Sequence, residues 1–191
     1  MQKHKIFLII GPSGVGKGTA IKRIKETDLN MFYPVSFTTR EKRINEVEGE
    51  TYYFIKKTEF EKKIKNNEFL EYQIVHGTHY YGTDKNSITE SLQDSSVLRE
   101  IDIAGVRDVL QNNSHLPIVT IFITTNNWET LVSRINKRQK MNEKELEQRK
   151  QSYQKELEFM EKSNYVVYSE ENKIDDLVTS IITIIKQETN A

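Results

Sequence analysis

The chain has 191 residues, which is long enough for one domain with a sizeable core and small inserted subdomains. Its 28 Lys and Arg residues balance its 28 Asp and Glu residues, so no overall field favours nucleic acid or an anionic membrane as a partner. The chain has no cysteine and no apolar run near the roughly 20 residues of a membrane helix, so we expect a cytoplasmic protein without disulfides or thiolate catalysis.

The first expected elements are a buried strand over residues 6–10, a glycine-rich turn and a helix over residues 19–26. The turn matches the pattern G-x-x-x-x-G-K, and its glycines let backbone N–H groups point inward at anionic oxygens. The helix adds its positive N-terminal end, and Lys17 adds an ammonium that reaches the β- and γ-phosphates. We favour a nucleotide-phosphate loop over an ordinary glycine-rich turn and assign the binding to Gly11, Pro12, Ser13, Gly14, Val15, Gly16, Lys17, Gly18 and Thr19.

Alternating strand and helix patterns in the rest of the chain predict an α/β fold with a parallel sheet wrapped by helices. Strands are expected at residues 33–36, 51–55, 69–75, 97–102, 118–123 and 165–168. Helices are expected at residues 58–66, with Thr58 and Glu61 forming a capping box, and at 87–92, 106–111, 128–137, 142–163 and 174–187. Ligands in such sheets bind beyond the carboxyl ends of the strands, where Gly11 and Asp102 lie.

The middle third departs from this alternation. Its strands, between residues 36 and 83, are short, rich in tyrosine and close together, which predicts an inserted, mostly antiparallel subdomain for a second substrate. Arg40 and Arg43 lie on an expected loop, and two guanidiniums suit a phosphate dianion, with Tyr52 and Tyr81 as hydroxyl donors. A solvated surface turn is the alternative.

Taken together, these segments closely resemble the guanylate kinase family over nearly the whole chain. The matching motifs are G-P-S-G-V-G-K at 11–17, S-F-T-T-R-E-K-R at 36–43, E-V-E-G-E-T-Y-Y-F at 46–54, F-L-E-Y at 69–72, H-G-T-H-Y-Y-G-T at 76–83, E-I-D-I-A-G-V at 100–106 and R-I-N-K-R at 134–138. The resemblance implies a P-loop nucleoside-monophosphate-kinase fold, with a core of residues 1–35, 96–133 and 164–191, an insert of 36–95 and a lid of 134–163. It also implies ATP-dependent phosphorylation of GMP, and of dGMP, with Mg²⁺ accompanying ATP.

The resemblance places the acceptor nucleotide in the insert. It implies that the GMP phosphate is held by Arg40, Arg43, Tyr52 and Tyr81, and that the guanine edge is recognised by Ser36, Glu71 and Thr83, with Gly82, Glu100 and Asp102 nearby. An ionised carboxylate such as Glu71 accepts from both N1–H and N2–H₂ of guanine but repels the N1 acceptor of adenine. An exposed strand carboxylate is the alternative for Glu71, and a helix N-cap is the alternative for Asp102.

The expected lid supplies cations to the transferring phosphoryl group. The catalytic residues implied by the resemblance are Lys17, Arg40, Arg134, Arg138 and Arg149, which position the reactants and neutralise charge during in-line attack by a GMP oxygen. A generally basic surface helix is the alternative for the lid arginines.

The sequence departs from the family pattern at three places. Gly18 replaces the usual Ser or Thr after the lysine, so Mg²⁺ ligation is assigned to Asp102 and Thr19, in part through water. The segment before Tyr81 is one residue longer than usual, which leaves open whether Tyr80 or Tyr81 meets the phosphate. Ser169 and Glu170 replace an Asn-Asp pair beside the adenine pocket.

Two other functions remain open at this point. The first is a guanylate-kinase-like module that binds phosphopeptides, which the complete phosphate loop argues against. The second is a kinase for another small phosphate, which Glu71 and Ser36 argue against. The sequence leaves the oligomeric state open.

Overall fold

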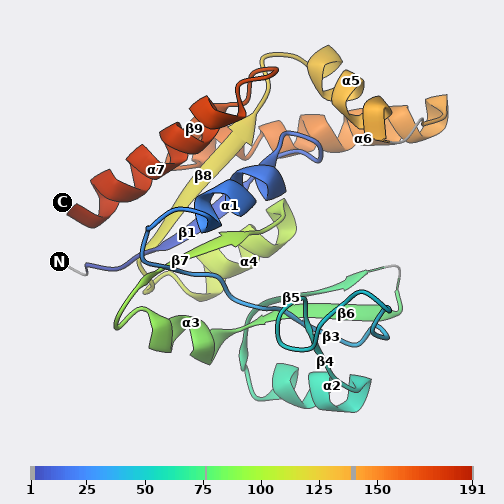
Figure 1. Ribbon diagram of the computed structural model, residues 1–191. Coiled ribbons are helices and arrows are strands. Elements are labelled where there is room, and N and C mark those ends of the chain that lie inside the picture. The colour runs from blue at the N-terminus through green and yellow to red at the C-terminus, as the bar shows by residue number, and fades with distance from the viewer. Residues whose placement is uncertain (1–2, 76, 139–140, 191) are drawn as a thin grey trace.

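The larger of two sheets forms the centre of the molecule. The computed structural model describes residues 3–75, 77–138 and 141–190. The strand order of this sheet is β2 (Met31–Phe32), β7 (Ser96–Glu100), β1 (Ile6–Ile10), β8 (Ile118–Thr124) and β9 (Tyr165–Tyr168), and every pairing is parallel. Helices cover both faces (Figure 1). The predicted α/β fold with a parallel core is therefore confirmed.

Two apolar clusters hold the central strand in place. All of β1 is buried, and alternate residues contribute to opposite faces. On one face Phe7 and Ile9 pack in the cluster formed with α1 (Lys17–Lys25) and α7 (Ile174–Asn190). On the other face Leu8 packs in the cluster formed with α3 (Lys85–Ser91) and α4 (Ile103–Asn112). The turn after β1 therefore starts from a rigid base.

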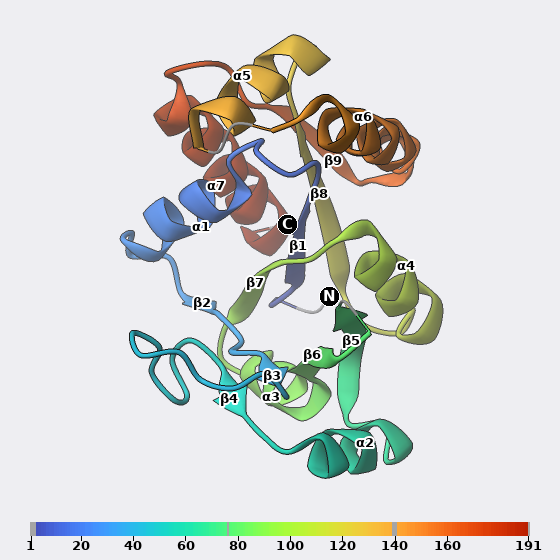
Figure 2. The ribbon, with the colours of Figure 1, turned by 90° about the vertical axis from the view of Figure 1, so that its right-hand side faces the viewer.

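A second, mixed sheet lies to one side of the core (Figure 2). Its order is β4 (Tyr53–Phe54), β3 (Phe37–Thr38), β6 (His79–Asp84) and β5 (Phe69–Val75), with antiparallel β3–β6 and β5–β6 pairs and a parallel β3–β4 pair. Phe60 of α2 (Lys57–Lys65) stacks on Phe69 with ring centroids 4.3 Å apart. A Cβ at Gly82 would lie 2.9 Å from the Phe60 ring, so glycine permits this contact.

The helices α5 (Trp128–Arg138) and α6 (Glu143–Leu157), followed by the short 3₁₀ helix Met160–Lys162, extend beyond the core on the same side as the second sheet (Figure 1). Asn142 and Glu145 form a capping box that begins α6. Trp128 packs against Tyr153, with ring centroids 5.2 Å apart, and joins the two helices.

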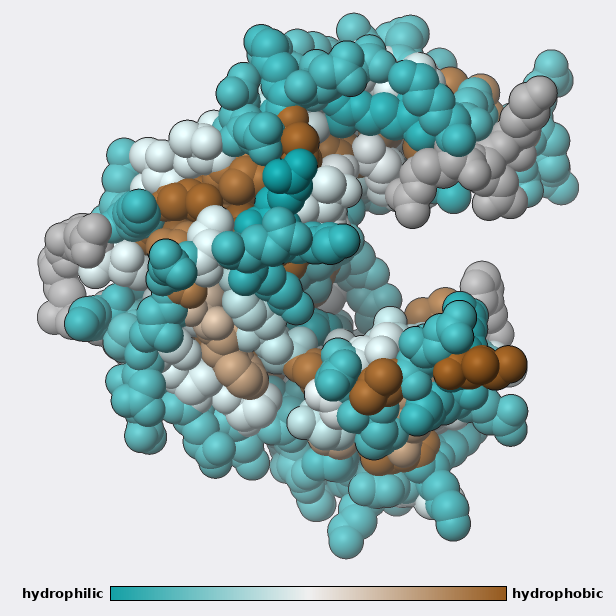
Figure 3. All heavy atoms as spheres, viewed as in Figure 1, coloured by the Kyte–Doolittle hydropathy of each residue, from teal (hydrophilic) through white to brown (hydrophobic). Residues whose placement is uncertain are grey.

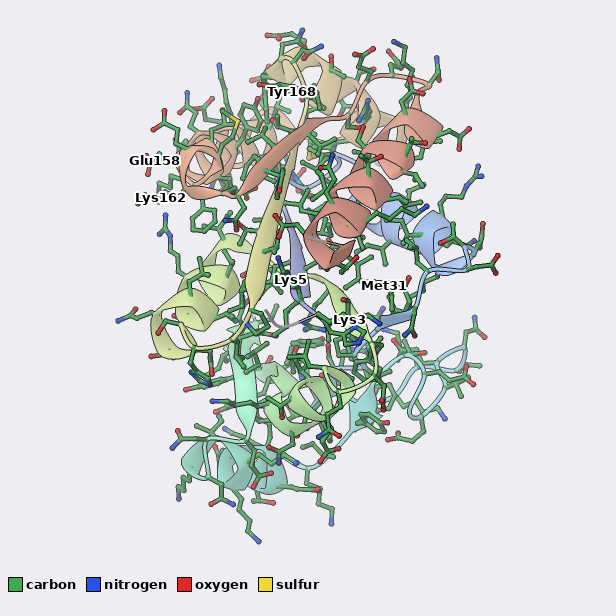
Figure 4. All side chains as sticks on the ribbon, turned by 90° about the vertical axis from the view of Figure 1, so that its left-hand side faces the viewer. Lys3, Lys5, Met31, Glu158, Lys162 and Tyr168 are labelled. Carbon is green, nitrogen blue, oxygen red and sulfur yellow. The ribbon has the colours of Figure 1, made fainter. Side chains whose placement is uncertain are left out.

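Residues near the two ends of the described chain contact each other at the amino ends of the parallel strands, opposite the phosphate loop. Lys5 and Tyr165 both donate to the Glu188 carboxylate, each at 2.5 Å, and these bonds lower the pKa of Glu188. Figure 4 shows Lys5 near the amino end of β1 and Tyr168 at the opposite, carboxyl end of the sheet. Within the described ranges, no helix has both the length and the apolarity to cross a membrane.

Several predicted boundaries were wrong at the start of helices. The helix expected at 19–26 begins at Lys17, because Gly16 at φ 102° serves as its N-cap. The capping box predicted at Thr58 and Glu61 is wrong: Lys56 is the N-cap, and Thr58 lies in the first turn. The helices expected at residues 87 and 106 begin earlier, at Lys85 and Ile103, because Asp84 and Asp102 cap them.

Predicted strands were wrong in the insert. The strand expected at 33–36 does not form; β2 ends at Phe32 and β3 begins at Phe37, because the chain passes from one sheet to the other here and Pro34 has no N–H to donate. The strand expected at 51–55 shortens to β4, and β6 was not predicted. The helix expected at 142–163 ends at Leu157, where Phe159 turns into the apolar cluster under α4.

We predict that Phe60→Ala destabilises the protein by about 3–5 kcal/mol, because it removes a fully buried ring that stacks on Phe69. Urea unfolding followed by circular dichroism measures the change. Ile44→Ala is the control, because its side chain is 101% exposed, and it should change stability by less than about 0.5 kcal/mol. Equal effects of the two substitutions would contradict the packing assigned to α2.

Candidate active site

A cleft of about 1010 Å³ lies between the core, the second sheet and helices α5 and α6. Figure 3 shows it as the deep opening on one side of the molecule, with predominantly hydrophilic residues along its rims. Its lining comes from the phosphate loop, from β5, β6 and β7, from α5 and α6, and from the segment after β9. The cleft therefore lies beyond the carboxyl ends of the parallel strands, where ligands of α/β proteins bind.

The phosphate loop follows β1 and passes unusually close to β8. Gly11, Gly14 and Gly16 have φ values of 136°, 92° and 102°, a region that residues with a Cβ rarely adopt. A Cβ at Gly11 would lie 2.0 Å from the carbonyl oxygen of Ile123. Only glycine therefore permits this path, which leads directly into the N-terminus of α1.

Lys17 places its ammonium inside the loop. Its Nζ donates to the carbonyl oxygens of Gly11 and Pro12, at 2.7 and 3.1 Å, and lies 3.5 Å from Glu100 Oε1. The side chain is 11% exposed and lines the cleft. A helix N-terminus beside a lysine ammonium has the chemistry that suits a polyphosphate.

Glu71 lies at the opposite wall of the cleft, in β5. It is 7% exposed, and its Oε1 accepts from Thr83 Oγ1 at 2.6 Å and from Arg99 Nη2 at 3.0 Å. Arg99 Nη2 also donates to Ser36 Oγ at 3.1 Å. The structure therefore brings together Ser36, Glu71 and Thr83, which the sequence analysis assigned to the guanine edge. Gly82 adjoins Thr83 in β6.

Arg40 is held in a fixed orientation by Glu46. Its Nη2 lies 2.6 Å from Glu46 Oε1, and its Nε donates to Tyr81 Oη at 3.2 Å. These contacts raise the pKa of Arg40, chiefly through the Glu46 hydrogen bond, and the same hydrogen bond lowers the pKa of Glu46. The guanidinium also lies over the Tyr52 ring, 5.6 Å from its centroid. Arg40 is thus a permanent cation with two phenols beside it.

The neighbouring tyrosines point in different directions. Tyr81 contacts Arg40 and lines the cleft, whereas the Tyr80 hydroxyl donates to Glu61 of α2 at 3.4 Å. Arg43 is exposed and lines a separate, smaller hollow with Arg40. The backbone N–H of Arg43 donates to Glu46 at 2.8 Å. The sequence leaves both tyrosines as candidates for contact with the acceptor phosphate; Tyr81 is the one that contacts Arg40.

Carboxylates surround the position expected to hold the metal. Asp102 caps α4 by accepting from Gly105 N–H at 2.8 Å, and the same oxygen accepts from Gln73. A Cβ built at Gly18 would lie 3.6 Å from Glu100 Oε2, so a carboxylate oxygen occupies the space beside the missing hydroxyl. Thr19 also lines the cleft. Among the described residues no group of three metal-ligating side chains occurs, but oxygen donors beside a phosphate site suit Mg²⁺, which takes part of its coordination from phosphates and water.

The predicted lid arginines occupy different positions. Arg134 donates through Nη1 to Ser169 Oγ at 2.9 Å and through Nη2 to the Ser169 carbonyl at 3.1 Å, so it joins α5 to the end of β9. Arg149 is exposed and lines a small hollow beside Pro12 and Ser13 of the phosphate loop. The side chain of Arg138 lies outside the described residues.

The sequence analysis gave no role to four residues that shape the site. Gln73, Arg99 and Glu156 line the cleft, and Glu46 fixes Arg40 beside it. Gln73 and Arg99 contact partners that are far away in the sequence, and Glu46 reaches Arg40 through the fold of a loop. No local sequence pattern specifies these contacts. Glu156, on α6, faces the phosphate loop; burial raises its pKa, and Asp102 adds to this while Lys17 opposes it.

The first strand of the parallel core leads into a phosphate loop, and the core, the second sheet and helices α5 and α6 surround one cleft. This arrangement defines a P-loop nucleoside-monophosphate-kinase fold. A family model for guanylate kinase matches residues 3–188, and the chain belongs to the guanylate kinase family.

The chain is similar to known members along nearly its full length. A guanylate kinase of Clostridium tetani is 42% identical over 189 residues, which cover 98% of this chain and 88% of that protein. One from Oceanobacillus iheyensis is 36% identical over 188 residues, or 98% and 89% of the two chains. The crystal structure of a guanylate kinase from Anaplasma phagocytophilum superimposes with a TM-score of 0.72 at 25% identity, covering 98% and 87%.

We predict that Glu156→Gln increases the free energy of unfolding at pH 7, because the pKa of Glu156 is raised and its ionised form is therefore less favourable in the folded state than in the unfolded one. The gain should vanish as the pH falls below the ordinary carboxyl value of about 4.3, where Glu156 of the parent is protonated in both states. Urea titrations across this range measure the difference. Glu158→Gln, at an exposed position two residues on, should have no such pH-dependent effect; a gain that persists at low pH would contradict the assignment.

Proposed function

We propose that this chain transfers the γ-phosphoryl group of ATP to GMP, or to dGMP, and releases ADP and the nucleoside diphosphate. The observation that supports the proposal most strongly is that one cleft contains both a phosphate loop with Lys17 and a buried carboxylate, Glu71, on the opposite wall. A polyphosphate donor and a guanine base would therefore face each other. The names of the relatives support the same activity.

Glu71 would select the base. Its Oε1 already has two donors, from Thr83 and Arg99, so the carboxylate is held in place with its second oxygen available. Guanine presents N1–H and N2–H₂ side by side as donors to such a carboxylate. Adenine presents an acceptor at N1, and a buried acceptor left unpaired costs about 1–3 kcal/mol. Sites of this kind discriminate by as much as about 10⁴-fold.

Arg40 would hold the acceptor phosphate, with Tyr81 and Tyr52 completing the site and Arg43 approaching from the neighbouring hollow. Glu46 fixes the guanidinium, which removes much of the entropy cost of orienting it on binding. The acceptor oxygen is already anionic, so in-line attack on the γ-phosphorus needs no protein nucleophile. Catalysis then consists of positioning and charge stabilisation.

Lys17 and the loop amides would stabilise charge on the β- and γ-phosphates, and Mg²⁺ bound with ATP would neutralise part of the same charge. Glu100, Asp102 and Thr19 would hold that ion, in part through water. We propose no direct metal bond from Gly18, which has no side chain.

The insert of residues 36–95 and the lid of residues 134–163 would close on the core residues 1–35, 96–133 and 164–191 when both nucleotides bind. Closure would exclude water that hydrolyses ATP and would bring Arg134, Arg138 and Arg149 to the transferring group. Ser169 and Glu170, at the end of β9, would border the adenine. The substrates of this reaction also support a cytoplasmic location. The complete phosphate loop favours turnover over the alternative of a phosphopeptide-binding module.

Lys17→Met should lower kcat by about 10²-fold or more while leaving the fold intact, because it removes one preorganised cation from the phosphates. A coupled assay of ADP formation with GMP measures the loss, and circular dichroism checks the fold. Lys22→Met changes an exposed lysine of the same helix and should leave kcat unchanged. Normal turnover in Lys17→Met would refute the assignment of the loop.

The same assay with GMP, AMP, CMP and UMP in parallel tests the acceptor. The parent should use GMP and scarcely use the others; substantial activity only with AMP would overturn the proposed function.

Glu71→Gln should raise the KM for GMP by about 10- to 100-fold and weaken the preference for GMP, since the amide places a donor where the base also donates. Glu59→Gln, at an exposed position of α2, is the control and should leave KM unchanged. Retention of the full GMP preference by Glu71→Gln would show that another residue recognises the base.

A further inference from the structure

Arg99 is a charged residue in an otherwise apolar part of the core sheet. Val97 and Ile101, two positions to either side, lie on the same face and are buried in the apolar cluster under α4. The Arg99 side chain is only 15% exposed, yet it lines the cleft. Burial of a guanidinium at this depth costs free energy, so its position needs compensation from specific partners.

The partners of Arg99 are the residues that surround the proposed guanine site. A single nitrogen, Nη2, donates to Ser36 Oγ at 3.1 Å and to Glu71 Oε1 at 3.0 Å. Through Arg99, strand β7 of the core therefore contacts the second sheet at Glu71, the carboxylate that we propose recognises the base. Among the described residues, Arg99 is the cation that forms an ion pair with this carboxylate.

These partners do not satisfy the whole guanidinium. An arginine carries five N–H donors in a fixed plane. Both hydrogen bonds that the Arg99 side chain makes to described residues use Nη2. Its Nε is buried and has no hydrogen-bond partner among the described residues. A buried donor without an acceptor is costly, so the site has more donors than the surrounding protein can match.

Guanine carries an acceptor of the kind that this guanidinium lacks. Its edge presents, in order, the O6 acceptor, the N1–H donor and the N2–H₂ donors. The Glu71 carboxylate can accept from both N1–H and N2–H₂. The group that faces O6, next to this carboxylate, must then be a hydrogen-bond donor. Arg99 contacts Glu71 and lines the cleft, so it is a donor beside that carboxylate.

We propose that Arg99 donates a hydrogen bond to O6 of the guanine base and is, with Glu71, a specificity-determining residue of this enzyme. The inference rests on the proposed function and deepens it, because recognition is divided between an acceptor for N1 and N2 and a cationic donor for O6. Adenine has an amino group in place of O6, and its N–H donors would meet the donors of Arg99.

Single-atom substrate analogues separate the two contacts. 6-Thioguanosine 5′-monophosphate keeps N1–H and N2–H₂ but replaces O6 by sulfur, a weaker acceptor, whereas inosine 5′-monophosphate keeps O6 and lacks the N2 amino group. The experiment measures kcat/KM for GMP and both analogues with the parent, Arg99→Met and Arg107→Met. Arg107 is an exposed arginine of α4 and provides the matched control. Ratios between substrates on one preparation do not depend on the fraction of folded enzyme.

The parent and Arg107→Met should prefer GMP over the thio analogue by about 10- to 100-fold, the value of a hydrogen bond from a charged donor. In Arg99→Met this preference should fall to within about threefold of unity, while the preference for GMP over the inosine nucleotide persists.

Two results would overturn the inference. An unchanged preference over the thio analogue in Arg99→Met would show that O6 does not contact Arg99. Loss of only the preference over the inosine nucleotide would show that Arg99 merely holds Glu71 in position. Either result leaves the proposed function standing if the parent phosphorylates GMP; a parent without that activity would overturn both.

Discussion

The close approach of the loop after β1 to its neighbour β8 is the constraint on which the active site depends. At Gly11 a Cβ would lie 2.0 Å from the carbonyl of Ile123, so the chain can turn here only with glycine. Because β1 is buried on both faces between two apolar clusters, the start of the turn cannot shift to relieve a clash. The same turn begins α1 and directs the Lys17 ammonium back into the loop, where it is 2.7 Å from the Gly11 carbonyl.

Paired charges organise the proposed acceptor site. Arg40 is fixed by Glu46, and Glu71 is fixed by Arg99, so in each pair one partner orients the group that we propose contacts the acceptor. Both pairs have side chains with little exposure, where an unpaired charge would be expensive. Preorganisation of this kind suits phosphoryl transfer, because the protein has little covalent chemistry to perform and acts through position and charge.

The long apolar strands of the core and the phosphate loop could be predicted from local pattern. Residues 6–10, 118–123 and 165–168 were placed within a residue of their observed ends, because each forms a continuous apolar or aromatic run; only the first two of these strands are largely buried. The strands of the insert were predicted poorly. β2 and β3 are each a pair of residues in different sheets, and so short a strand leaves no periodicity to detect; their pairing partners define them.

The sequence by itself determined the family resemblance, the parallel core and the identity of the loop that begins at Gly11, since each depends on neighbouring residues and their spacing. Only the tertiary structure decided that Arg99 meets Glu71 and Ser36, which lie 28 and 63 positions away, and that Tyr81 rather than Tyr80 meets Arg40. The physical reason is that these contacts join separate strands and sheets. Their geometry follows from the register of β3, β5 and β6 in the second sheet and of β7 in the core sheet, and local sequence does not specify that arrangement.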